Sequence, residues 1–142
     1  MSERTASVTW SGSLLEGAGR IESVGSGAFA PLDVTWASRT EEPGGRTSPE
    51  ELIAAAHASC FSMALSHALA QAGNPPDRLE TSATVTFVPG TGITKSALTV
   101  RGSVPGMDED AFRAAAEDAK VNCPVSKALA AVPEITLDAS LL

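Results

Sequence analysis

The 142-residue sequence is poor in aromatic residues and in positive charge. It has 4 Phe, 2 Trp and no Tyr, so its core must be built mainly from Ala, Val, Leu and Ile. Lys and Arg number 10 against 17 Asp and Glu, which gives a net charge of −7. A negative surface repels phosphate backbones, and no basic cluster interrupts it, so we expect no nucleic-acid partner.

Long apolar runs and a targeting leader are also missing. No apolar run reaches the roughly 20 residues that a membrane span needs, so we expect no membrane partner. The first residues, MSERTASVTW, lack a basic segment followed by an apolar one. Both absences favour a cytoplasmic location, where thiols normally stay reduced. A permanent disulfide between the only two cysteines, Cys60 and Cys123, is thereby disfavoured.

What is present suits one globular domain over residues 1–142. Hydrophobic residues make up 43% of the chain and charged residues 19%. A chain of this length buries a sizeable core without a disulfide. Neither a repeat nor a linker divides it, so we expect a single domain.

Strand and helix patterns follow one another along the chain and predict an α+β fold. The first part predicts strands at 7–12, 19–24 and 31–38, followed by a polar loop at 40–48. The last part predicts a hairpin from 80–90 and 92–104, helices at 108–120 and 125–131, and a strand within 133–141.

A helix over residues 49–72 has the strongest local signals. The stretch Ser48-Pro49-Glu50-Glu51 supplies an N-cap serine, a proline at the first helical position and a glutamate that can bond back to the cap. Gly73, followed by Asn and two Pro, ends the helix. Its middle is apolar or small on nearly every side, which predicts burial all round and close approach by another element.

The two cysteines have several interpretations when taken alone. A helical cysteine such as Cys60 is commonly inert core filler. Cys123 precedes Pro124 at the expected start of a short helix, where the helix dipole lowers the pKa of a thiol.

Two histidines lie near Cys60 in the sequence. Zinc needs three or four ligands, usually in close pairs, and the chain offers only its two cysteines, His57 and His67, so we expect no metal. His57 shares a helix face with Cys60 and is either its general base, as in a cysteine hydrolase, or a packed histidine with one bonded nitrogen. We favour the packed histidine because no oxyanion hole or orienting group is visible, and we assign no chemistry to His67.

Two stretches resemble a known family. TSPEELIAAAHASCFSMAL (47–65) is similar to the signature of the osmotically inducible protein C (OsmC) family, relatives of the organic hydroperoxide resistance proteins (Ohr). NCPVSKAL (122–129) resembles that family's second-cysteine motif. The resemblance covers nearly the whole chain. The stretch AAAHASCFSMAL fits the OsmC branch better than the Ohr branch.

The resemblance implies an intertwined homodimer, in which antiparallel sheets wrap around long buried central helices and the active sites lie at the subunit interface. It implies a thiol-dependent peroxidase for oxidative or osmotic stress defence, which reduces organic hydroperoxides and, less well, hydrogen peroxide. Cys60 would be the peroxidatic thiol and Cys123 the resolving thiol. An external thiol, a small dithiol or a dithiol protein, would reduce the resulting disulfide, and neither metal nor flavin is required.

The resemblance also implies a glutamate and an arginine that activate the first thiol. By motif position the glutamate is Glu50. Arg39, which precedes the long helix, matches the arginine best, and Arg20 and Arg46 are the alternatives.

Physical chemistry adds two conditions to these roles. An apolar helix raises the pKa of a thiol by desolvation, so a cation must lie close to Cys60, and arginine suits because it is always charged. A disulfide requires the two cysteine Cα atoms within about 7 Å, unless the break at 122–124 moves. Glu50 and Cys60 are ten residues apart, about 15 Å along a helix, so we expect either a bridging Arg39 or a Glu50 from a second chain.

Two rival functions stay open. One is a non-catalytic stress or ligand-binding protein on the same fold, and the other is the hydrolase that uses His57. The apolar residues near Cys60 would favour hydroperoxides with a carbon tail, or would serve equally well as core, and they are Leu52, Ile53, Phe61 and Met63.

Overall fold

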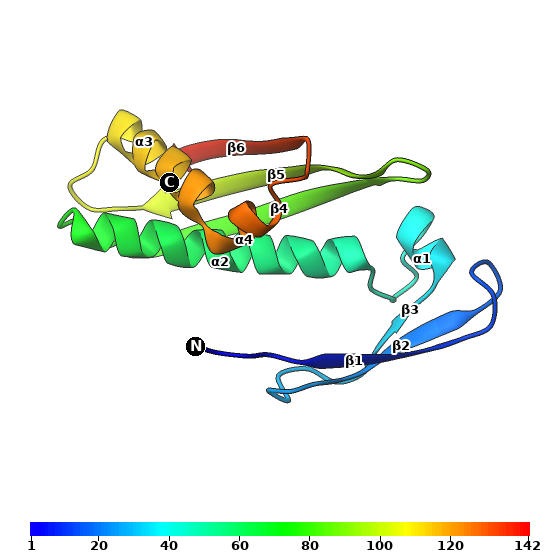
Figure 1. Cartoon of the computed structure of the whole chain (residues 1–142). Coiled ribbons are helices and arrows are strands. Elements are labelled where there is room, and N and C mark those ends of the chain that lie inside the picture. The colour runs from blue at the N-terminus through cyan, green and yellow to red at the C-terminus, as the bar shows by residue number, and fades with distance from the viewer. The chain divides into compact units, whose positions relative to one another are not determined.

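The protein contains two three-stranded sheets and four helices, and this computed structural model describes all of residues 1–142 (Figure 1). The chain divides into two compact units, residues 1–52 and residues 53–142, each with one sheet. The predicted α+β class is confirmed. A single domain over residues 1–142 remains a prediction.

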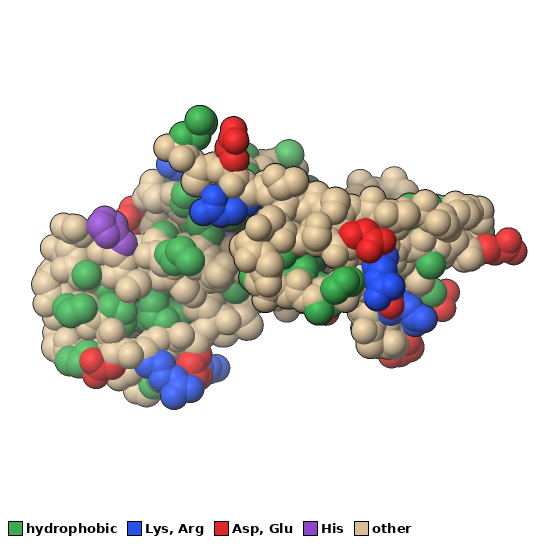
Figure 2. Space-filling model, turned by 90° about the horizontal axis from the view of Figure 1, so that it is seen from below, with side chains coloured by type: hydrophobic (Ala, Val, Ile, Leu, Met, Phe, Trp, Pro, Cys, Tyr) green, Lys and Arg blue, Asp and Glu red, His purple; other side chains and the backbone are tan.

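The first unit begins with the predicted meander. Strands β1 (Ala6–Ser11), β2 (Ala18–Val24) and β3 (Leu32–Val34) pair in order and antiparallel. Among its hydrophobic residues only Ile21 is buried, and β1 is exposed along its whole length. Hydrophobic side chains therefore remain exposed in this unit, among them Trp10 and Phe29. Figure 2 shows hydrophobic side chains scattered over the face that it draws.

Helix α1 (Trp36–Thr40) occupies the end of the segment that we predicted as the third strand. The strand prediction is wrong beyond Val34 because a capping box starts a helical turn. The Thr35 hydroxyl accepts a hydrogen bond from the Ser38 N–H (3.0 Å), and the Ser38 hydroxyl accepts one from the Thr35 N–H (2.9 Å). Ser38 also donates to the carbonyl oxygen of Thr47 (3.1 Å), which joins the two ends of the polar loop.

Helix α2 (Pro49–Gln71) begins and ends close to the predicted residues. The hydroxyl of Ser48 accepts a hydrogen bond from the Glu51 N–H (3.2 Å), which confirms the N-cap. The Glu51 carboxylate accepts a hydrogen bond from the Thr47 hydroxyl (2.9 Å) instead of closing the capping box. At the other end Gly73 takes the left-handed conformation (φ 86°), which favours glycine.

The second sheet consists of the predicted hairpin, β4 (Arg78–Val88) and β5 (Gly92–Ser103), and of β6 (Glu134–Leu141). β4 and β5 are antiparallel, but β6 pairs parallel to β5, so this sheet is mixed rather than wholly antiparallel. The reason is the crossover through α3 (Glu109–Asn122) and α4 (Pro124–Ala128), which returns the chain in the direction of β5.

The core of the second unit lies between one face of β5 and the helices α2 and α3. Alternate β5 residues such as Leu98 and Val100 point to this face because strand side chains alternate. Phe112 of α3 and Phe61 of α2 are both fully buried there. Because α2 and α3 pack on the same face of β5, α2 lies next to the segment that contains α3 and α4.

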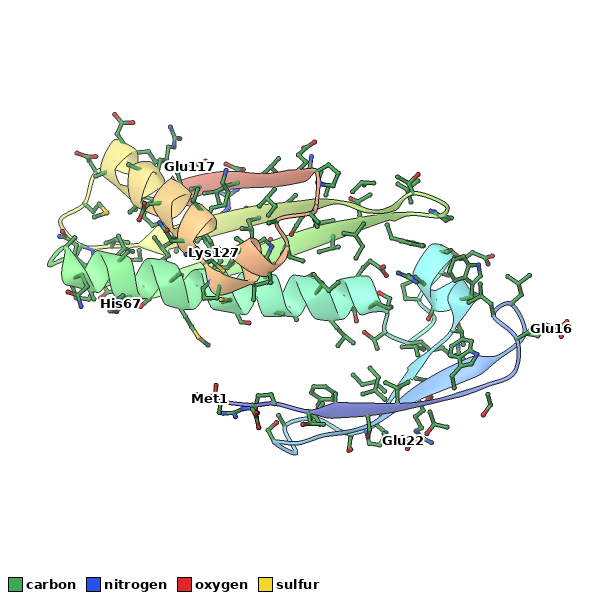
Figure 3. The ribbon with its side chains drawn as sticks, viewed as in Figure 1. Met1, Glu16, Glu22, His67, Glu117 and Lys127 are labelled. Carbon is green, nitrogen blue, oxygen red and sulfur yellow. The ribbon has the colours of Figure 1, made fainter.

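Only one row of α2 is buried within the chain. The buried residues are Glu50 in the first turn and then, at every fourth position, His57, Phe61, Leu65 and Leu69. Met63 is 71% exposed, and His67 is also exposed at the surface of α2 (Figure 3). Burial all round is therefore not reached in a single chain.

By length and composition alone, α2 is apolar enough to cross a membrane, contrary to our expectation that no such run exists. The core helix of a globular protein passes the same test, so one such helix is a weak indication. Of the most apolar 18-residue stretch of α2, 22% is buried.

Candidate active site

The fold brings together the two cysteines, which lie far apart in the sequence. Cys60 lies in the middle of α2 and is half-buried, whereas Cys123, at the junction of α3 and α4, is 0% exposed. Both are free thiols, Cys60 packs against the hydrophobic cluster that contains Cys123, and Cys123 lies close enough to act on the pKa of Cys60. The expected approach of the two sulfurs is therefore present in the second unit of one chain.

The surroundings of Cys60 oppose its ionisation. Burial raises the pKa of the Cys60 thiol above its ordinary value of 9.0. A hydrogen bond from the backbone N–H of Val125 lowers this pKa, and the nearby Cys123 thiol raises it. None of these causes is a cation.

Cys123 is held by its own backbone. Its N–H donates to the carbonyl oxygen of Ala119 at the end of α3 (2.8 Å). Its carbonyl oxygen accepts from the N–H of Lys127 in the first turn of α4 (3.1 Å). The break at 122–124 is thus an ordered junction between two helices, and the contact with Cys60 exists without a movement of this segment.

His57 has polar partners on both ring nitrogens, which the sequence did not predict. Nδ1 lies 2.7 Å from the Ser96 hydroxyl of β5, and Nε2 lies 2.8 Å from the Ser126 hydroxyl of α4. The ring is 0% exposed, and burial lowers its pKa below the ordinary 6.5, so the imidazole is neutral near pH 7. Because both nitrogens are engaged by serines, a role as base for Cys60 would require one of these bonds to break.

The predicted arginine and glutamate form an ion pair in the first unit. Arg39 Nε donates to both carboxylate oxygens of Glu50 (2.9 and 3.2 Å), and Nη2 donates to Oε1 (2.7 Å). The side chain of Glu50 is 8% exposed and that of Arg39 is 27% exposed. The Arg39 guanidinium also lies 5.9 Å from the ring centroid of Trp36. The capping box of α1 and the N-terminal turn of α2 hold the two partners in this geometry.

The alternative arginines have other surroundings. Arg20 lies 3.7 Å from Asp33 in an exposed ion pair across β2 and β3. Arg46 is exposed in the polar loop. Of the three candidates, Arg39 is the one whose guanidinium binds Glu50.

The apolar residues named from the sequence as neighbours of Cys60 divide between two roles. Phe61 is 0% exposed and belongs to the core, so it cannot line an entry to the thiol. Met63 is exposed and borders an open groove of about 570 Å³ between the end of α2 and the start of β4. Neither cysteine lines this groove. No group of three or more His, Cys, Asp or Glu residues could hold a metal ion.

Comparison with known proteins agrees with the sequence motifs. The profile of the OsmC-like protein family matches residues 42–138, a range that contains Glu50, Cys60 and Cys123 and begins after Arg39. Peroxiredoxin OsmC of Escherichia coli (strain K12) is 44% identical over 135 residues, which cover 93% of this chain and 92% of that protein.

Solved structures agree in fold. The organic hydroperoxide resistance protein OsmC of Legionella pneumophila has a TM-score of 0.67 at 22% identity and covers 96% of both chains. An organic hydroperoxide resistance protein of Elizabethkingia anophelis has a TM-score of 0.70 at 21% identity, over 97% of this chain and 96% of that one. With the family profile and the E. coli relative, these likenesses lead to one assignment. The chain belongs to the OsmC-like protein family.

Proposed function

We propose that the protein is a cysteine-based peroxidase that reduces organic hydroperoxides, and hydrogen peroxide less well, through Cys60 and Cys123. The single observation that carries the proposal is that the fold brings the two free thiols into one hydrophobic cluster, where Cys123 acts on the pKa of Cys60. The relative in E. coli, which is 44% identical, is named a peroxiredoxin. Peroxide reduction is therefore the activity that fits both the geometry and the family.

The first step of the reaction takes place at Cys60. The thiolate attacks the terminal peroxide oxygen, an S–O bond forms as the O–O bond breaks, and the departing alkoxide takes a proton to become an alcohol. In the second step Cys123 attacks the sulfenic sulfur, which gives the disulfide and water. A small dithiol or a dithiol protein then reduces the disulfide by exchange.

Arg39 supplies the cation that Cys60 lacks. Burial raises the pKa of Cys60, and the thiolate needs a positive charge to offset this desolvation. The carboxylate of Glu50 holds the Arg39 guanidinium in a fixed orientation, from which it also binds the departing alkoxide. Arg39 and Glu50 are the activating pair, and Arg20 and Arg46 are not required.

The activating pair comes from a second copy of the chain, so the working form is an intertwined homodimer. Ten residues of α-helix correspond to about 15 Å, too far for Glu50 and Cys60 of one helix to meet. Met63 of α2 is 71% exposed, and contact with a partner would cover this large hydrophobic side chain. The near absence of buried hydrophobic residues in the first unit favours the same arrangement.

The preference for organic hydroperoxides rests on the apolar surroundings of the first thiol. Ala64 and Val125 are partly buried hydrophobic residues of the same cluster as Cys60. A carbon tail gains free energy from contact with such a surface, whereas hydrogen peroxide does not. The cycle needs a thiol reductant, so the reducing cytoplasm is the compartment that fits it.

A count of free thiols after one equivalent of cumene hydroperoxide tests this function. We expect both thiols to disappear as one peroxide is consumed. Two untouched thiols would instead support a ligand-binding protein on the same fold. A burst with an ester substrate that persists in Cys123→Ser would support a hydrolase.

Two variants separate the roles of the cysteines. Cys60→Ser should abolish peroxide reduction because it removes the attacking sulfur. Cys123→Ser should allow one turnover and then accumulate sulfinic acid at Cys60, since no second thiol is present to form the disulfide. Mass spectrometry of the intact chain distinguishes these products. Steady turnover by Cys60→Ser would exclude the assignment.

A further inference from the structure

His57 is a fully buried polar residue for which the proposed reaction has no use. It lies on α2 three residues before Cys60. Its two ring nitrogens bind one hydroxyl from the sheet, Ser96, and one from the short helix α4, Ser126. A polar ring is costly to bury, so its two hydrogen bonds offset a penalty that an apolar side chain would avoid.

The partner on α4 lies in the same turn as the second cysteine. Cys123 is the N-cap of α4, and its carbonyl oxygen accepts a hydrogen bond from the Lys127 N–H (3.1 Å). This bond closes one helical turn around Ser126. A hydrogen bond from His57 to Ser126 therefore fixes the position of Cys123 relative to α2.

The same turn contacts Cys60 at a second point. The backbone N–H of Val125, which lies between Cys123 and Ser126 in the chain, donates to the Cys60 sulfur. The α4 turn thus presents a thiol and an N–H to Cys60, and His57 is the side chain that ties this turn to the helix of Cys60. Displacement of the turn would weaken both contacts together.

We propose that His57 is a positioning residue for the resolving step, which it serves by holding the α4 turn through Ser126. The inference rests on the proposed peroxidase function. In this step the Cys123 sulfur attacks the sulfenic sulfur of Cys60, so that an S–S bond forms while the S–O bond and the S–H bond break, and water leaves. The sulfenic sulfur is reduced and the Cys123 sulfur is oxidised. A fixed turn keeps the two sulfurs in contact, so the disulfide forms before a second peroxide oxidises Cys60 to the sulfinic acid.

Ser126→Ala and Ser96→Ala form a matched pair for the test. Each removes one buried hydroxyl that binds His57, but only Ser126 lies on the helix that begins at Cys123. Neither substitution touches a cysteine, Arg39 or Glu50. Ser126→Thr retains a hydroxyl and serves as the conservative variant.

The first readout is the share of Cys60 that becomes over-oxidised per peroxide consumed. The loss of one hydrogen bond should raise this share about fivefold in Ser126→Ala. Ser96→Ala should stay within about twofold of the wild type, and Ser126→Thr should restore the wild-type share. The rate of the first step, measured as peroxide loss in single turnover, should be unchanged in Ser96→Ala and Ser126→Thr. In Ser126→Ala it should fall, because the Val125 N–H that lowers the pKa of Cys60 moves with the turn, but by less than the over-oxidised share rises.

The second readout needs no peroxide. Equilibration with mixtures of reduced and oxidised glutathione gives the effective concentration of one thiol at the other. We expect this concentration to fall about fivefold in Ser126→Ala and to be retained in Ser96→Ala. The measurement separates the inference from the function on which it rests.

Three outcomes would overturn the inference. Equal changes in Ser126→Ala and Ser96→Ala, in step with equal losses of melting temperature, would make His57 an ordinary core contact. Unchanged over-oxidation and effective concentration in Ser126→Ala would exclude the positioning role while leaving the peroxidase intact. A wild-type protein that does not consume peroxide would remove the function and the inference together.

Discussion

Cys60 lies in surroundings that keep its thiol protonated, although its proposed chemistry needs the thiolate. Burial raises the pKa of Cys60, so its reactivity should rise with pH through that pKa. If Arg39 acts on this sulfur, Arg39→Met should move the midpoint upward by about one pH unit or more, since the cation favours the charged form. The rate of alkylation by iodoacetamide against pH, measured in Cys123→Ser so that one thiol reacts, gives the midpoint.

Arg20→Met and Arg46→Met are the controls for this titration. Arg20 pairs with Asp33, and Arg46 lies exposed in a loop, so neither change should move the midpoint. If Arg46→Met shifts the midpoint and Arg39→Met does not, the assignment of the activating arginine is wrong. The family resemblance named Arg39 and Glu50 as activating residues, but only the structure gives the three short N–O distances that join them.

The packing of α3 on β5 depends on one residue without a side chain. A Cβ at Gly102 would lie 2.6 and 2.7 Å from two ring carbons of Phe112, and 3.2 Å from Leu79. Gly102→Ala should therefore lower the free energy of unfolding by about 1–3 kcal/mol through overpacking. Denaturant unfolding measures the loss. In a Phe112→Leu background the cost should shrink because the clashing ring is gone, and an equal cost in both backgrounds would exclude this explanation.

Elements with strong local signals could be predicted from the sequence, and elements set by distant contacts could not. Ser48 and Gly73 mark the ends of α2 through backbone bonds within a few residues. Helix α1 begins at an equally local capping box at Thr35. The helix is short and directly follows an alternating strand pattern, so the sequence predicted a longer strand in its place. The parallel pairing of β6 depends on where the crossover returns, which no local pattern specifies.

At the scale of the molecule, the candidate site could be predicted in its residue types but not in its connections. The two motifs, which resemble those of a known family, named both cysteines and Glu50, and the same resemblance favoured Arg39 over Arg20 and Arg46. The hydrogen bonds from His57 to serines on β5 and α4 join residues distant in sequence, and Ser and His carry no spacing signal of their own. The sequence also could not show that the thiols meet within one unit while the ion pair forms in the other.

That separation leads to a test of whether one site uses two chains. Cys60→Ser and Arg39→Met chains, each with its own tag, are co-expressed, and the mixed dimer is purified through both tags. Each variant alone should be inactive. If Cys60 of one chain works with Arg39 of the other, the mixed dimer holds one intact site and should recover about half of the wild-type peroxidase activity.

The alternatives give different results in the same experiment. If both residues of a site belonged to one chain, every site in the mixed dimer would carry a substitution, and the preparation would stay inactive. If the chain were a monomer, no species would carry both tags. Native mass spectrometry therefore accompanies the assay, because it shows that the mixed dimer is present before its activity is interpreted. Recovery in that species requires that a guanidinium from one copy reach the thiol of the other. The exposed Met63 of α2 and the separation of about 15 Å between Glu50 and Cys60 along the helix both favour this arrangement.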